Sequence, residues 1–159
     1  MTPTHRGILG AAVLLACAGA TAHAQRPAYF FGELGGPGGL ASLNLEANPV
    51  GPLRTRLGAG LFLFWPSIPL TATATFGSDH HALELGLGAT VVIVPAESAH
   101  HSNELFDWGN PSGTRLIGTG VVGYRYAPRS GWLVRATVTP LYDTRRAVFW
   151  LGVSLGHRL

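Results

Sequence analysis

The stretch Gly120–Pro140, GVVGYRYAPRSGWLVRATVTP, indicates the fold class because two alternating runs flank a short turn. Successive side chains of a β-strand point to opposite faces, so the alternation separates two sets of residues. One set holds Arg125 and Arg135. The other set holds the aromatic residues that border the turn, which are Tyr124, Tyr126 and Trp132. An arginine facing lipid near the midplane of a transmembrane barrel costs about 2–4 kcal/mol. The pattern therefore predicts arginines inside and aromatic residues outside, the reverse of a soluble sheet.

Alternating runs bounded by turn residues recur along the chain, with no helical periodicity after Gln25. The runs cover residues 28–36, 40–46, 53–64, 68–76, 81–94, 113–126, 132–141 and 147–159. Several contain ten residues or more, whereas strands of soluble sheets usually have about five or six. Strands that cross a bilayer need about nine to eleven residues. The expected fold class is all-β, a transmembrane up-and-down antiparallel β-barrel of about eight strands.

The polar face of these runs is built from small residues and isolated charges. Residues 70–76 place Thr71, Thr73 and Thr75 opposite Leu, Ala and Phe side chains. Residues 83–93 place Glu84, two glycines and a threonine opposite a row of apolar side chains. Small residues suit the inside of an eight-stranded barrel, which is only wide enough for side chains to fill. A water-facing surface would carry many more charges.

The N-terminus has the features of an export signal. Arg6 precedes an apolar run, and Ala22-His23-Ala24 forms a small-x-small cleavage site, so residues 1–24 are expected to be a cleaved secretory signal peptide. The run is too short to span a membrane as a helix. Residues 25–159 then form the barrel domain, reached by Sec-dependent export. LLAC, ending at Cys17, leaves open a lipoprotein signal.

Composition excludes several functions. The chain is 47% hydrophobic and 12% charged, and its eleven basic residues are all arginine. A formal net charge of +3 with scattered arginines does not indicate nucleic acid binding. Cys17 is the only cysteine, so the expected mature chain has no disulfide and no thiol chemistry. No cofactor is expected.

Connection lengths predict the orientation. Bacterial outer-membrane barrels have short periplasmic turns and longer loops outside. Counting from the first strand puts residues 77–79 and 127–131 at the periplasmic end. The longest connection, residues 95–112, falls at the outer end, although residues 37–39 and 65–67 would be short outer turns.

The chain resembles small bacterial outer-membrane β-barrel proteins of the eight-stranded type found in Bacteroidetes-like genomes. The matching pieces are GELGGPGGLASLNLE, HHALELGLGATVV, GVVGYRYAPRSGWLVRATVTPLY and LGVSLGHRL, which touch most of the expected mature chain. The resemblance implies the barrel fold and carries no activity. Such chains usually end in an aromatic residue that the barrel-assembly machinery reads, whereas this one ends in Leu159.

Charged residues of inward parity form the first candidate site. They are Glu46, Arg54, Arg56, Glu84, Arg125, Arg135 and Arg158. Buried charges must be paired, so we interpret this set as a structural salt-bridge network that closes the lumen, with Glu84 paired to Arg135. A gate or an anion-binding constriction is the functional alternative. Phe62, Phe64 and Trp150 are expected inside the outer half of the barrel, and Tyr124, Tyr126 and Trp132 form an expected aromatic girdle outside.

The longest loop contains a weak metal candidate. In a helical conformation Glu97, His100, His101 and Glu104 would share one face. Imidazole and carboxylate suit zinc or another divalent cation. The sequence shows no tight ligand motif, so an ordinary solvated loop is the preferred interpretation. His80 and His81 form a second pair at the other end of the barrel.

The same loop suggests an enzymatic alternative. His101-Ser102-Asn103 is similar to the His/Ser pair of lipid A 3-O-deacylases, which are small outer-membrane barrels, and Glu104 is a nearby acid. Here the pair lies in a loop rather than on a rigid strand, which does not favour a nucleophile held by its base. A soluble lipocalin-like periplasmic binder of apolar ligands is the third alternative.

The sequence thus predicts a monomeric barrel in a Gram-negative outer membrane with a structural or interaction role, not an enzyme or an open channel. Its expected partners are outer-membrane lipid, lipopolysaccharide and, during biogenesis, the barrel-assembly machinery.

Overall fold

The computed structural model describes residues 28–78, 80–95, 113–143 and 146–159, and every structural statement concerns these residues. They form eight strands: β1 (Tyr29–Gly35), β2 (Ala41–Val50), β3 (Leu53–Phe62), β4 (Trp65–Gly77), β5 (His81–Val94), β6 (Gly113–Tyr126), β7 (Trp132–Tyr142) and β8 (Ala147–Arg158). Within these ranges, no helix has the length and apolar character needed to span a membrane.

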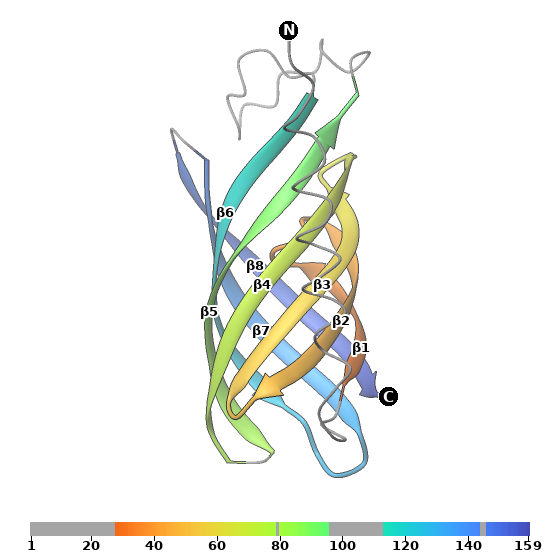
Figure 1. The fold of residues 1–159 in the computed structure, drawn as a ribbon, viewed down its shortest axis with the longest axis vertical. Helices are drawn as coiled ribbons and strands as arrows, with labels where there is room; N and C mark the ends of the chain where they lie inside the picture. The colour runs from red at the N-terminus through yellow and green to blue at the C-terminus, as the bar shows by residue number, and fades with distance from the viewer. Residues whose placement is uncertain (1–27, 79, 96–112, 144–145) are drawn as a thin grey trace, which may run out of the picture.

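The strands close into a single barrel. Each strand pairs antiparallel with the next, and β1 pairs antiparallel with β8 from Tyr29↔Arg158 to Gly35↔Gly152. Closure leaves no strand edge with unpaired backbone groups. Figure 1 shows the strongly tilted strands of the wall. The predicted all-β up-and-down antiparallel barrel of eight strands is confirmed.

The two ends of the barrel differ. The connections β2–β3, β4–β5 and β6–β7 share one end, here called the turn end, with the start of β1 and the end of β8. The other four connections leave from the opposite end, here called the loop end. β5 and β6 have 14 residues each and β1 has 7, so the wall is tallest at the loop end of β5 and β6 (Figure 1).

Strand bounds agree with the sequence prediction for β5 and β6, but the turn between β3 and β4 was placed wrongly. Residues 65–67 were expected to be a turn because of Pro66, yet they begin β4. The chain reverses at Leu63 and Phe64 instead, and Phe62 pairs with Trp65. Leu63 adopts a left-handed conformation with φ of 56°. Leucine rarely does so, and no glycine or asparagine marked the turn.

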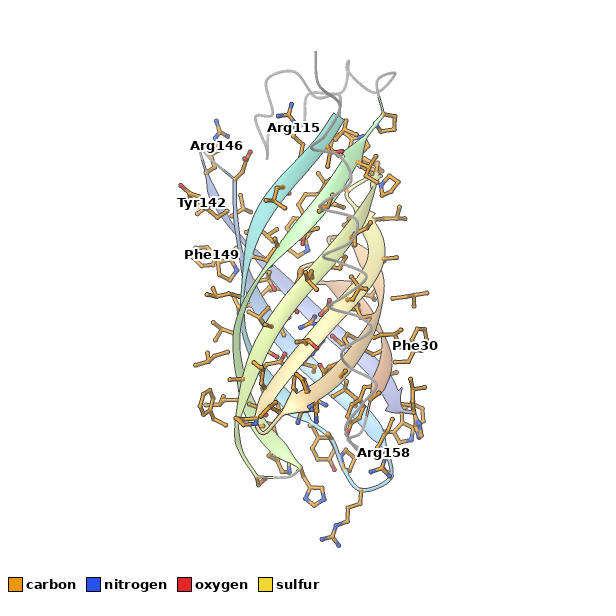
Figure 2. All side chains as sticks on the ribbon, in the orientation of Figure 1. Phe30, Arg115, Tyr142, Arg146, Phe149 and Arg158 are labelled. Carbon is orange, nitrogen blue, oxygen red and sulfur yellow. The ribbon has the colours of Figure 1, made fainter. Side chains whose placement is uncertain are left out.

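The outward face of the barrel is apolar. The exposed large hydrophobic side chains outnumber the buried ones, and Leu87 is 76% exposed at the middle of β5. Figure 2 shows Phe30, Tyr142 and Phe149 pointing away from the wall. Within the described strands, no arginine or glutamate lies on the outward face away from the strand ends. This distribution is the reverse of a soluble barrel, whose apolar side chains face inward.

The loop between β1 and β2 folds into the barrel. Residues 36–39 are buried, and their carbonyl groups accept hydrogen bonds from side chains of the wall. Thr90 Oγ1 donates to the Pro37 carbonyl at 2.7 Å, and Ser67 Oγ donates to the Gly38 carbonyl at 2.7 Å. Trp150 Nε1 donates to the Gly39 carbonyl at 3.3 Å. The predicted turn at residues 37–39 exists, but its position inside the lumen was not anticipated.

Glycine is required in this inward loop. Gly39 has a φ of 98°, a region that side-chain-bearing residues rarely adopt, and a Cβ there would lie 2.5 Å from Phe62 Cα. A Cβ on Gly38 would lie 2.5 Å from Ser42 Cβ. The glycine-rich sequence therefore lets the backbone pack directly against the side chains of the lumen.

Apolar side chains fill the loop end of the lumen. The buried cluster consists of Phe62, Trp65, Val92, Val94, Ile117 and Leu141, with Leu63, Val148 and Trp150 packed against it. The rings of Phe62 and Trp150 stack with centroids 6.5 Å apart. Phe62 and Trp150 face inward as predicted. The prediction for Phe64 was wrong, since it occupies the β3–β4 turn and is 81% exposed.

Candidate functional site

The inward face of the barrel below the apolar cluster holds a network of charged side chains. Three glutamates and four arginines from six strands contribute: Glu33, Glu46, Glu84, Arg54, Arg56, Arg125 and Arg135. They gather because inward parity on neighbouring strands places them at similar heights, as the register Glu46↔Arg56 and Arg125↔Arg135 shows. All except Arg54 are buried.

Arg135 lies at the centre of the network and is 1% exposed. Its Nη1 donates to Glu46 Oε2 at 3.1 Å and to both carboxylate oxygens of Glu84 at 3.3 Å. Its Nη2 donates to Ser154 Oγ at 3.4 Å and lies 3.6 Å from Glu33 Oε1. One guanidinium thus joins three carboxylates, a role that its planar fork of donors suits and a lysine could not fill.

Arg56 forms a second bridge across the barrel. Its Nη1 donates to both carboxylate oxygens of Glu33 at 3.2 Å, and its Nη2 donates to Glu84 Oε1 at 3.5 Å. The Phe31 ring contacts both central arginines, with centroid distances of 5.5 Å to Arg56 Cζ and 4.4 Å to Arg135 Cζ. Cation–π contact and ion pairing together compensate these buried cations for their lost hydration.

Arg54 and Arg125 form the part of the network nearest the turn end. Arg125 Nη1 donates to Glu46 Oε1 at 2.7 Å, and its Cζ lies 4.7 Å from the centroid of the Tyr29 ring. Arg54 Nη1 donates to Asn48 Oδ1 at 2.6 Å and lies 3.5 Å from Glu46 Oε1. Both arginines therefore depend on Glu46 as their carboxylate partner among the described residues.

The structure separates one predicted member from the network and adds another. Arg158 has inward parity but is exposed at the end of β8, so its placement in the lumen was wrong. Figure 2 shows it at the turn end, away from the interior. Glu33 is 2% exposed and pairs with Arg56 and Arg135, although sequence reasoning missed it. The alternation of Tyr29, Phe31 and Glu33 against Phe30 and Leu34 was the available signal.

Of the other predicted sites, the aromatic residues lie on the outward face. Tyr124, Tyr126 and Trp132 are 47%, 37% and 51% exposed. Tyr124 and Tyr126 lie beside the ring of His81, whose Nδ1 forms a hydrogen bond with the Tyr124 hydroxyl. At the loop end Phe64, Tyr142 and Phe149 also face outward. Exposed aromatic side chains thus border both ends of the apolar band.

The metal and enzymatic candidates cannot be placed. Glu97, His100, His101, Glu104 and Ser102 all lie outside the described residues. Among the residues that are described, no three His, Cys, Asp or Glu side chains gather in a way that could hold a metal ion. His80 and His81 diverge, because His80 lines a cavity at the turn end whereas His81 faces outward against the two tyrosines.

The fold is similar to that of solved β-barrel structures, among them the following two. The N-terminal β-barrel domain of Pseudomonas aeruginosa OprF has a TM-score of 0.59 and 12% identity, covering 84% of this chain and 96% of that domain. The Yersinia pestis outer membrane protein Ail, determined in a phospholipid bilayer nanodisc, has a TM-score of 0.53 and 12% identity, covering 85% of this chain and all of that one (100%). No family model and no curated protein matches the sequence.

Proposed function

We propose that this chain is an integral outer-membrane β-barrel protein with a closed lumen and a structural or interaction role, neither an enzyme nor an open channel. The observation that carries the proposal is the inside-out distribution of side chains. Apolar residues form a band on the outward face, while ion-paired charges occupy the interior. Such a surface is favourable only in lipid. Its structural neighbours are outer-membrane β-barrel proteins, and the narrower resemblance to barrels of Bacteroidetes-like genomes is part of the proposal.

Three layers of packed residues close the lumen. The apolar cluster occupies the loop end, residues 36–39 fill the space beside it, and the charged network crosses the barrel towards the turn end. An interior of eight strands is just wide enough for side chains. A soluble lipid-binding barrel would need an open apolar cavity in place of these layers.

The first experiment is heat-modifiability of the protein in the outer-membrane fraction on a semi-native gel. A band that changes mobility only after boiling is the expected result for a folded transmembrane barrel. A soluble periplasmic protein without a mobility shift would contradict the membrane assignment. Reconstitution into planar bilayers beside an open porin tests the lumen separately, and we expect no steady conductance.

Orientation can be tested with single cysteines, since the expected mature chain has none. Thr114→Cys lies at the loop end and Ser130→Cys at the turn end, and both positions are exposed. A thiol reagent that cannot cross membranes should label Thr114→Cys on intact cells and Ser130→Cys only after the cells are opened. The reverse labelling would contradict a periplasmic turn end.

A further inference from the structure

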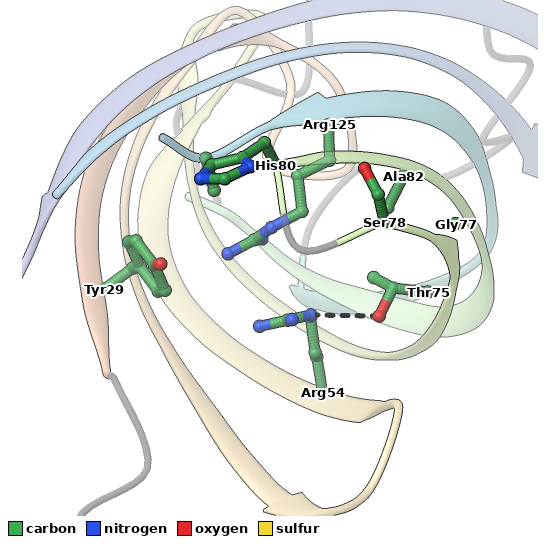
Figure 3. Close-up of a pocket in the computed structure, with 9 residues that line it drawn as sticks. Tyr29, Arg54, Thr75, Gly77, Ser78, His80, Ala82 and Arg125 are labelled. Atoms are coloured by element: carbon green, nitrogen blue, oxygen red, sulfur yellow. Dashed lines mark hydrogen bonds between the residues drawn. The ribbon is translucent and has the colours of Figure 1, made fainter. Parts of the chain in front are cut away.

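A cavity of about 200 Å³ opens at the turn end of the barrel, below the charged network (Figure 3). Its polar lining includes Tyr29, Arg54, Thr75, Ser78, His80 and Arg125. Figure 3 shows the guanidinium groups of Arg54 and Arg125 directed into the same space, with Tyr29 at its side. The volume is well above the space that one water molecule needs.

Arg125 is one of the residues that line this cavity, and its guanidinium carries an unused donor. The side chain is 3% exposed, and its Nη2 is buried without a hydrogen-bond partner among the described residues. Its Nη1 is occupied by Glu46, and the Tyr29 ring contacts the guanidinium by its face. A buried charged donor left unsatisfied is unfavourable, and native structures rarely keep one. The cavity is therefore lined by a guanidinium that still lacks one acceptor among the described residues.

The balance of charge points to a negatively charged acceptor. The charged network has Arg54, Arg56, Arg125 and Arg135 against Glu33, Glu46 and Glu84. Glu33 and Glu84 pair with Arg56 and Arg135. Glu46 alone serves Arg54 at 3.5 Å and Arg125 at 2.7 Å, and it also contacts Arg135 at 3.1 Å. The uncompensated positive charge thus belongs to the two arginines that line the cavity.

We propose that the cavity at the turn end binds a small oxyanion of the phosphate class between Arg54 and Arg125. The planar forks of two guanidinium groups match the oxygens of such an anion. The hydroxyl groups of Tyr29 and Ser78 and the ring of His80 line the same cavity and offer further donors. Free phosphate and the phosphate of a lipid headgroup share this chemistry. The site does not depend on which side of the membrane the turn end faces.

The test is calorimetric titration of the folded full-length mature barrel with inorganic phosphate. The protein is held in a maltoside detergent, which contains no phosphate, at constant ionic strength with chloride as the balancing anion. We expect saturable binding of one phosphate at roughly millimolar concentration or below. Arg54→Gln and Arg125→Gln should each weaken it by roughly ten-fold or more, because each removes a charge-assisted hydrogen bond. No saturable binding by the wild-type protein would overturn the proposal.

Arg158→Gln is the matched control, since it removes the same charge at the same end but outside the cavity. It should leave the affinity unchanged, and an equal loss in this variant would show nonspecific attraction and overturn the site. Arg125→Gln removes a partner of Glu46, so its folding is checked by heat-modifiable mobility. Arg54 is only partly buried, with 17% of its side chain exposed, and its variant keeps the test valid if Arg125→Gln does not fold.

Two further arms identify the occupant. In nanodiscs of phosphatidylglycerol, an unchanged phosphate affinity supports a site for free phosphate, whereas a reduced affinity supports occupation by a lipid headgroup.

Asp79, which lies outside the described residues, follows Ser78 in the chain. Phosphate binding by Asp79→Asn but not by the wild-type protein would show that this carboxylate already serves the arginines, and the proposal would then fail.

Discussion

The two halves of the lumen are built from residues of the same inward parity, yet they are stabilised in different ways. At the loop end the apolar cluster around Phe62 and Leu141 gains from removal of hydrocarbon from water, which has no directional requirement. Towards the turn end the network around Arg135 requires each charge to meet its partners, because an unpaired ion in the interior is strongly unfavourable. The apolar half should therefore tolerate changes of side-chain shape, whereas the charged half should tolerate only changes that preserve the charges and their geometry.

The largest effect is expected from Arg135→Met. The substitution removes the guanidinium that joins Glu33, Glu46 and Glu84, and it leaves these carboxylates short of a partner. Breaking a buried ion pair in this way costs about 3–5 kcal/mol of the free energy of unfolding. Urea unfolding in lipid vesicles, followed by the mobility shift, measures the loss. Arg158→Met is the matched control and should change stability by less than about 0.5 kcal/mol, and equal loss in both variants would refute a special role for the network.

A cavity at the loop end should have a somewhat smaller effect. Leu141→Ala removes a fully buried side chain from the apolar cluster, with an expected loss of about 3 kcal/mol. The same urea experiment measures it. Leu151→Ala removes an equal side chain from the outward face of neighbouring β8, where the side chain is 74% exposed, and serves as the control. If both variants lost the same stability, the loop end would not be packed as described.

Exchange of the charges of Glu84 and Arg135 tests how far the charged half depends on this one pair. Their opposite charges lie 3.3 Å apart, but Glu84 also contacts Arg56, and Arg135 also contacts Glu46. The double variant Glu84→Arg/Arg135→Glu should therefore recover only part of the stability lost in the single variants, with a coupling of about 0.5–3 kcal/mol. A double-mutant cycle of urea unfolding measures this coupling. Absence of any recovery would mean that the other contacts dominate the pair.

The smallest effect is expected from a conservative change in the apolar half. Leu141→Met preserves volume and polarity, so it should cost less than about 1.5 kcal/mol. Arg135→Lys is the equally conservative change in the charged half, and it should cost more than Leu141→Met because one ammonium cannot reach Glu46, Glu84 and Ser154 together. Unfolding curves of the two variants under identical conditions make the comparison. Similar losses in both would remove the proposed difference between the halves.

Much of the fold could be predicted because period two is a local property of the chain. The bounds of β5 and β6 follow from long, largely alternating runs between turn residues. The β3–β4 turn could not be predicted in this way. Leu63 adopts a positive φ without any residue that favours it, while Pro66, which suggested a turn, lies within β4 paired with Leu61. Closure of the hairpin overrides the local preference there.

The candidate site was predictable only in part. Parity selected most of the inward charges, but parity alone does not show that Arg158, exposed at the end of β8, lies outside the network. Glu33 was missed because β1 is short and glycine-rich, so its alternation covers few residues. The cavity between Arg54 and Arg125 had no sequence signal, since its walls come from both β3 and β6, which are not neighbours in the barrel.

The apolar face of each strand and the number of strands follow from local sequence, because both depend on the alternation of neighbouring residues. Three features follow from the packed fold instead: which inward charges meet, the entry of residues 36–39 into the lumen, and the sharing of Glu46 by three arginines. Those outcomes depend on the register between strands and on closure of β1 against β8. Both bring together residues far apart in the chain, at heights that no local pattern encodes.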